Sequence, residues 1–382
     1  MRNLFPIIFS IVIIVLFGVF QLLFLKLFNR QWWTKRWIRT FSWILPFAGI
    51  LMVILWGYGE YYAVSWLALS GALLAILTLI LEVGLFISLP FSGVIHLFQW
   101  LIDRLLSHNI KKHHSVSFDQ NRRLFLKTTA AAIPIITLAT GTAGVVKAMS
   151  GVNVFKKTIY FDNLPSDLDG LKILHLSDMH LSHYLVLEDL VDVLAQAEHF
   201  SPDLTLITGD IADDLRLLPN ALKLIEQLNH PYGTYASLGN HEYFRGIAEV
   251  HRYFDKSTIP LLVNDFVRVK INNTPLFIGG LDDPRLMGAK DYKFFRKAVN
   301  TTLTNKNHDD FVVLMSHRPD ALDYASEKEV ALTLAGHTHG GQVGFGNRSL
   351  FESMWPNRYL WGHYQKKQSH LYTSSGVGHW FP

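Results

Sequence analysis

The chain has 382 residues, of which 49% are hydrophobic and 17% are charged, and its mean hydropathy is +0.20. Soluble globular proteins carry about 25% charged residues, so the composition excludes full disorder and fits an ordinary cytosolic enzyme poorly. Cysteine is absent, which excludes a disulfide scaffold, thiolate catalysis and cysteine-ligated zinc.

The net charge of +4 combines two parts of opposite sign. Residues 1–150 hold 13 Lys and Arg against 4 Asp and Glu, a net of +9, and residues 151–382 hold 22 against 27, a net of −5. Of the 18 histidines, 14 lie in the second part. The basic excess therefore belongs to one part only, and no nucleic-acid partner is expected from it.

Long uncharged runs fill the first part of the chain. A bilayer core of ~30 Å needs about 20 apolar residues in helical conformation. The runs cover residues 4–25, 41–58, 63–102 (interrupted by Glu82) and 128–146. They predict that residues 1–150 form a transmembrane region of about four helices.

Basic loops at residues 26–39 and 104–127 set the expected orientation. Positively charged loops favour the cytoplasmic side, so an even number of spans should separate these two loops. Residues 41–58 supply one span, and residues 63–102 should then supply one more. Residues 91–106 would lie in the interface or extend a long tilted helix, with a break near Pro90. If residues 63–102 are instead two spans, one basic loop lies on the wrong side.

Four spans would place the second part of the chain outside the cytoplasm. Residues 121–127 (NRRLFLK) resemble a twin-arginine export motif, with Asn where Ser or Thr is usual. The alternative is the basic flank of an ordinary span. Both interpretations point the following domain outward, so we expect a multi-pass protein of the inner or plasma membrane with an extracytoplasmic domain.

The second part has the alternating pattern of an α/β domain, because short β-branched or apolar runs are separated by amphipathic segments. Strands are predicted at residues 171–176, 203–208, 234–238, 266–271, 275–279, 311–316, 330–335 and 370–374. Helices are predicted at residues 186–199, 215–228, 247–254 and 292–303.

Five of these strands end in Asp, His or Asn beside Gly or Ser. The segments are residues 177–180 (SDMH), 208–213 (TGDIAD), 238–242 (LGNHE), 316–317 (SH) and 335–341 (AGHTHGG). Ligand sites of open α/β folds lie at the carboxyl ends of strands. Oxygen and imidazole donors without sulfur suit divalent Mn, Fe, Zn or Co, so a metal site is predicted there.

The spacing of the polar residues suits a pair of ions. On an extended segment residues i and i+2 point the same way, so Asp178 and His180 could reach one ion, and His337 and His339 have the same spacing. A carboxylate between two ions can hold them ~3.5–4 Å apart, as in two-metal hydrolases.

Together these five segments resemble the calcineurin-like metallophosphoesterase superfamily over residues 157–382. Residues 279–284 and 336–342 are similar to its membrane-associated or exported bacterial branch, which includes UDP-2,3-diacylglucosamine diphosphatase-like proteins. The resemblance implies a four-layer α/β/β/α sandwich with a dimetal site at the strand ends.

The resemblance also implies roles for individual residues. Asp210 would bridge two divalent ions, and His241 would stand over the leaving group as a proton donor. The first ion would be held by Asp178, His180, Asp210 and His339, and the second by Asp210, Asn240, His317 and His337. Asp213 and Glu242 would orient imidazoles or loops. The family usually has Asp where Ala331 stands; this is not a ligand position, so metal binding should survive and a supporting hydrogen bond is lost. The family also continues beyond Pro382 into a further strand, so either the protein ends early or the sequence is truncated, and a less stable sheet edge is expected.

The predicted function is a membrane-anchored phosphoesterase that hydrolyses a phosphodiester or pyrophosphate bond by metal-activated hydroxide attack. The expected partners are a phosphoester substrate, lipid-linked or from the cell envelope, and membrane lipid. Two alternatives stay open: a tethered phosphatase for soluble phosphoesters, and a membrane sensor or transport protein with a regulatory domain. The last is disfavoured because Glu60 and Glu82 are expected near the ends of spans. The sequence sets neither the metal, the substrate nor the oligomeric state.

Overall fold

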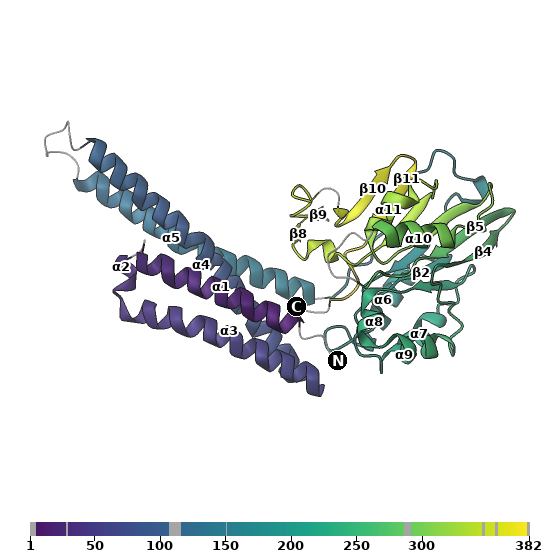
Figure 1. The fold of residues 1–382 in the computed structure, drawn as a ribbon, viewed down its shortest axis with the longest axis horizontal. Helices are drawn as coiled ribbons and strands as arrows, with labels where there is room; N and C mark the ends of the chain where they lie inside the picture. The colour runs from purple at the N-terminus through teal and green to yellow at the C-terminus, as the bar shows by residue number, and fades with distance from the viewer. Residues whose placement is uncertain are drawn as a thin grey trace. The chain divides into compact units, whose positions relative to one another are not determined.

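The computed structural model describes residues 5–27, 30–106, 116–149, 151–285, 292–345, 348–355 and 358–379. The chain divides into two compact units, Met1–Ser150 and Gly151–Phe381 (Figure 1).

The first unit consists of helices. They are α1 (Phe5–Leu27), α2 (Arg30–Trp33), α3 (Arg36–Tyr62), α4 (Ser65–Leu106) and α5 (Val116–Met149). Four stretches within them are long and apolar enough to cross a membrane: Pro6–Leu27, Arg36–Tyr62, Ser65–Pro90 and Ala132–Met149. Many of their large apolar side chains face outward, including Phe47, which is 64% exposed. A lipid-facing helix surface has this character.

The structure corrects two expectations about α4. It is one helix of 42 residues that continues through Pro90, which agrees with the alternative that residues 91–106 extend a long helix and not with a break near Pro90. A proline removes a single helical hydrogen bond, and helices packed in a membrane region tolerate that loss. Glu82 lies well inside the span Ser65–Pro90 and is 1% exposed, so its expected position near a span end is wrong. The twin-arginine-like residues 121–127 lie within α5.

The second unit contains two main sheets. The first is parallel, in the order β1 (Ile173–Leu176), β2 (Leu204–Thr208), β3 (Thr234–Ser237). The second is mixed and has six strands in the order β10-β11-β7-β6-β5-β4. Their bounds are Gly362–Lys366, Ser369–Thr373, Leu332–Ala335, Phe311–Met315, Thr274–Gly280 and Asp265–Ile271. A small hairpin joins β8 (Gly344–Phe345) to β9 (Arg348–Ser349).

Helices cover the outer faces of both sheets. Along the first sheet run α6 (Leu187–Glu198), α7 (Leu218–Glu226) and α9 (Ile247–Phe254), and along the second α10 (Tyr292–Thr302) and α11 (Leu322–Ala325). Between the sheets, Leu206 of β2 packs in one buried cluster with Ile278 of β5 and Leu334 of β7. The layers are therefore α/β/β/α, and the predicted fold class is confirmed.

Candidate metal centre

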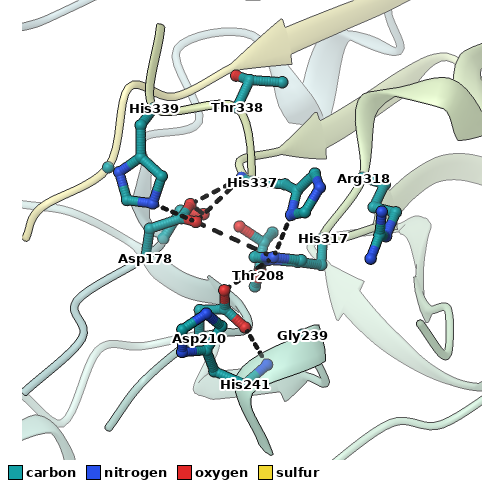
Figure 2. Close-up of polar contacts among 12 residues, drawn as sticks. Asp178, Thr208, Asp210, Gly239, His241, His317, Arg318, His337, Thr338 and His339 are labelled. Carbon is teal, nitrogen blue, oxygen red and sulfur yellow. Dashed lines mark hydrogen bonds and ion pairs between the residues drawn. The ribbon is translucent and has the colours of Figure 1, made fainter. Parts of the chain in front are cut away.

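The side chains predicted to bind metal come together at the carboxyl ends of five strands. They follow β1, β2, β3, β6 and β7, and Figure 2 shows most of them facing one another. Because parallel strands present their carboxyl ends at one edge, residues from positions 178 to 339 meet in one place.

One group of ligand atoms is formed by Asp178, His180 and His339, all within 4.8 Å of one another. The Nε2 atoms of His180 and His339 lie 3.2 Å apart, and Nε2 of His339 lies 3.5 Å from Oδ1 of Asp178. Asp178 and His180 are fully buried. Two imidazole nitrogens that face each other beside a carboxylate have the arrangement of ligands to one cation.

A second group is formed by Asp210, His317 and His337. Nε2 of His317 lies 3.1 Å from Oδ2 of Asp210 and 3.2 Å from Nδ1 of His337. The same Oδ2 of Asp210 lies 3.6 Å from Nε2 of His180 in the first group. Asp210 therefore stands between the two groups.

Asn240 supplies a further oxygen. It is the first residue of α8 (Asn240–Arg245) and is 5% exposed. Its side-chain Oδ1 is buried and has no hydrogen-bond partner among the described residues. A buried amide oxygen without a partner is costly, and a cation beside it would remove that cost. The donors present thus fit two divalent ions.

The backbone at the ligands differs from the extended conformation expected for Asp178–x–His180 and for His337–x–His339. The φ angle is +50° at Asp178, +48° at His180, +53° at Asp210, +70° at His337 and +46° at His339. Left-handed conformations are uncommon for residues other than glycine and cluster at functional sites. The side chains converge through these turns rather than by alternation along a strand.

Two glycines allow the backbones to pack against the carboxylates. A Cβ atom on Gly336 would lie 2.0 Å from Oδ2 of Asp178, and one on Gly239 would lie 2.2 Å from Oδ1 of Asp210. No side chain fits at either position.

Hydrogen bonds orient the ligands. Nδ1 of His317 donates to the carbonyl of Thr208 at 2.8 Å, which leaves Nε2 to face Asp210. The backbone N–H of His337 donates to both oxygens of Asp178 at 3.0 Å. The backbone N–H groups of Gly239, Asp210 and Ile211 all donate to the buried carboxylate of Glu242. Glu242 thereby ties the loops after β2 and β3 together.

Burial and neighbouring charges shift the pKa values of the site histidines in opposite directions. Burial lowers the pKa of His339 to about 4 and that of His337 well below its ordinary value. Burial also lowers the pKa of His317, but the carboxylates of Asp210 and Asp178 outweigh it and raise the value to about 10. Burial thus favours neutral His337 and His339, and the carboxylates that favour a positive charge at His317 would equally favour a cation there in place of the proton.

His241 belongs to a third group with His180 and Asp213. Its Nδ1 lies 2.5 Å from Oδ1 of Asp213, which also accepts from Nε of Arg245 at 3.1 Å. Burial lowers the pKa of His241, but the charges of Asp210 and Asp213 raise it further, to about 9. His241 is thus an imidazolium at neutral pH, beside the metal ligands but bound to a different carboxylate.

Sequence reasoning missed one buried ion pair near the site. Nε of Arg318 donates to Oδ2 of Asp283 at 2.7 Å, and the two side chains are 3% and 0% exposed. Arg318 follows the ligand His317 directly, so the pair fixes the loop after β6. An arginine next to a predicted ligand at the end of a buried strand was the available signal.

Comparisons with known proteins relate the chain to one family. The profile of calcineurin-like phosphoesterases matches residues 171–341. An uncharacterized metallophosphoesterase, YkuE, of Bacillus subtilis is 30% identical over 68% of this chain and 91% of its own length. A zebrafish protein named transmembrane protein with metallophosphoesterase domain is 26% identical over 63% of this chain and 55% of its own. A solved zebrafish dimetal phosphatase aligns with a TM-score of 0.35 at 12% identity, over 54% of this chain and 88% of its own.

The family profile and the metallophosphoesterase relatives show a metal-dependent phosphoric ester hydrolase. The chain belongs to the calcineurin-like metallophosphoesterase family. Its four apolar helices and its transmembrane-named relatives indicate a membrane protein. The narrower likeness to UDP-2,3-diacylglucosamine diphosphatases stays a prediction.

Proposed function

We propose that this protein is a membrane-anchored dimetal phosphoesterase that hydrolyses a phosphodiester or pyrophosphate bond in a lipid-linked or envelope substrate. The observation that carries the proposal is the pair of candidate ligand groups with Asp210 between them, its Oδ2 3.1 Å from His317 and 3.6 Å from His180, in a chain with four helices able to span a membrane.

In this proposal Asp178, His180 and His339 hold one ion, His317, His337 and Asn240 hold the other, and Asp210 binds both. Two such ions, when bound, neutralise phosphate oxygens and supply a hydroxide at neutral pH. The protein's contribution is a set of buried, pre-oriented donors. The hydrogen bond of His317 to the carbonyl of Thr208, and those of the two loops to the carboxylate of Glu242, keep the metal-binding side chains in place.

His241 is the proposed proton donor to the departing oxygen. Its ring lies 4.5 Å from that of His180, and its side chain is 14% exposed, so one edge is accessible. Asp213 holds Nδ1, so Nε2 would carry the transferable proton, and the carboxylates of Asp210 and Asp213 raise the pKa of the ring. A charged imidazole placed in this way stabilises a leaving alkoxide or phosphate.

The proposed location of the catalytic domain is the extracytoplasmic side. The support is the distribution of basic residues: residues 26–39 hold five and residues 104–127 hold six, and a single span in α4 would put both on the cytoplasmic side. The domain follows the fourth span.

A second candidate function, a membrane sensor or transport protein, is favoured by Glu82 alone. Both carboxylate oxygens are buried and have no hydrogen-bond partner among the described residues. Ionisable groups inside membrane helices are commonly functional. Unchanged hydrolysis and unchanged ion flux in a Glu82→Gln variant would remove this candidate.

The proposed function is tested with the full chain in detergent and Mn²⁺. We expect hydrolysis of bis-p-nitrophenyl phosphate, and a panel of UDP-diacylglucosamine, phospholipids, nucleotides and cell-wall phosphodiesters should show the highest kcat/KM for a lipid-linked member. A preference for the soluble nucleotides would favour the tethered phosphatase instead.

A further inference from the structure

Segment 343–355, which follows the metal ligands of β7, exposes an unusual share of apolar side chains. Within residues 151–379, ten large apolar side chains are exposed among those described, and four of them lie in this segment. They are Val343 (48%), Leu350 (59%), Met354 (64%) and Trp355 (48%). Single exposed apolar residues are ordinary, whereas a cluster beside a site marks an interaction surface. We call these four residues the apolar rim.

The rim is built onto the metal centre. Gly341, two residues after the ligand His339, packs so closely on the segment that a Cβ atom would lie 2.8 Å from Oγ of Ser349. The β8–β9 hairpin closes within the segment, and the ring of Phe351 lies 5.4 Å from that of Trp355. The rim is therefore held in a fixed place next to the ligands of β7.

The charges of this region suit an anionic surface. Arg348 and Arg358 are exposed. The acidic residue of the segment, Glu352, accepts a hydrogen bond from the hydroxyl of Tyr364 at 2.7 Å. Leu and Trp beside Arg are residue types typical of segments that lie in the bilayer interface.

The domain follows a candidate membrane span in the same chain, so a bilayer is always close to it. The last candidate span ends at Met149, and the first element of the domain begins at Ser166. Residues 151–164 make no backbone hydrogen bond within the described part of the chain, but Val152, Ile159 and Phe161 pack against the clusters of the domain, so few residues separate the domain from the last candidate span. Tethering raises the effective concentration of the membrane at the domain surface.

We propose that the apolar rim inserts into the bilayer interface and holds the metal centre against the membrane, where a phosphoester linked to lipid lies. The proposal rests on the proposed lipid-linked substrate and assigns the surface that gives access to it. Interfacial segments bury their apolar side chains ~5–10 Å into the boundary between headgroups and acyl chains.

Site-specific fluorescence tests the contact directly. The chain has no cysteine, so a fluorophore on Leu350→Cys or Met354→Cys reports a single position. Val191→Cys on α6, which is 45% exposed, is the matched control. The labelled full chain is placed in vesicles of phosphatidylcholine and phosphatidylglycerol that contain spin-labelled lipid. We expect quenching at 350 and 354 at least about twice that at 191. Equal quenching at all three positions, or a blue shift without lipid quenching, would overturn the proposal.

Enzyme kinetics distinguish an effect of the rim on access to membrane substrates from an effect on hydrolysis itself. The native chain and two variants, Leu350→Asp/Met354→Asp and Val191→Asp, are given dodecyl p-nitrophenyl phosphate in vesicles and bis-p-nitrophenyl phosphate in solution. We expect the ratio of the two kcat/KM values to fall about tenfold only in the double variant. An unchanged ratio would contradict the rim's role. If the native chain hydrolyses neither substrate, the proposed function fails, while the quenching result still decides whether the rim meets lipid.

Discussion

Nε2 of His317 lies 3.1 Å from Oδ2 of Asp210, and this contact joins the loop after β2 to the loop after β6 across the two sheets. Asp210 also faces His180 of the other ligand group. Asp210→Asn keeps the shape and removes the charge, so we expect the rate on bis-p-nitrophenyl phosphate to fall more than about a hundredfold. Metal analysis should show loss of bound ion in parallel. Full activity with full metal content would contradict the bridging role.

Asp213 provides a test of the His241 assignment. Its carboxylate holds Nδ1 of His241 at 2.5 Å, and its loss should misorient the imidazole. We expect Asp213→Asn to lower kcat about 10- to 100-fold, with some loss of metal as well, because Oδ2 of Asp213 also lies 3.4 Å from Nδ1 of His180. Asp214→Asn is the matched control, because Asp214 pairs with Arg216, whose side chain is 72% exposed. Equal effects of the two substitutions would argue against the role of Asp213.

Gly336 tests the close packing at the ligands. A methyl group there would overlap Oγ of Ser177 and Oδ2 of Asp178, so Gly336→Ala should displace the Asp178 carboxylate. We expect weaker metal binding, measured as a higher Mn²⁺ concentration for half-maximal rate. Gly144→Ala, where nothing lies within 4 Å, should behave like the native chain. Unchanged Mn²⁺ dependence in the Gly336 variant would show that the loop can move to make room for the methyl group.

The Arg268–Asp310 pair predicts a pH-dependent part of stability. Nε and Nη2 of Arg268 reach Asp310 at 3.1 and 2.9 Å. Burial raises the pKa of Asp310, but hydrogen bonds from Arg268 and from the backbone of Asn307 lower it further, below 3.8. A depressed carboxyl pKa gives stability that is present above the unfolded value and is lost as pH falls through the folded one.

The corresponding variant is Asp310→Asn. We expect it to be less stable than the native chain at pH 7 by about 1–3 kcal/mol, measured by thermal unfolding. The difference should shrink below about pH 4, where the carboxyl of the unfolded chain takes up a proton before the native one does. A difference that is constant across that range would mean that the pair contributes through packing rather than charge.

Much of the fold was predictable because its strands are short and apolar and are bounded by turn residues. All eight predicted strands form, and most bounds shift by one or two residues. The sequence did not reveal β10 (Gly362–Lys366), because its polar residues at an exposed sheet edge have no apolar alternation. It also did not reveal α8, which begins inside the segment LGNHE. Glu242 caps the start of this helix by accepting a hydrogen bond from the N–H of Gly239.

The site was predictable in composition but not in conformation. Polar residues at strand ends identified Asp178, Asp210 and His317 as neighbours, because parallel strands share an edge. The left-handed turns at five ligands depend on contacts between distant loops, such as the N–H of His180 donating to the carbonyl of Asp210. The Arg318–Asp283 pair joins residues 35 positions apart, a distance over which a single sequence carries no pairing signal.

The most direct test of the central claim is metal analysis combined with hydrolysis of bis-p-nitrophenyl phosphate by the purified full chain. We predict that each chain binds two divalent ions, that chelation abolishes hydrolysis, and that added Mn²⁺ restores it. Hydrolysis that persists at the full rate after every ion has been removed would contradict this prediction.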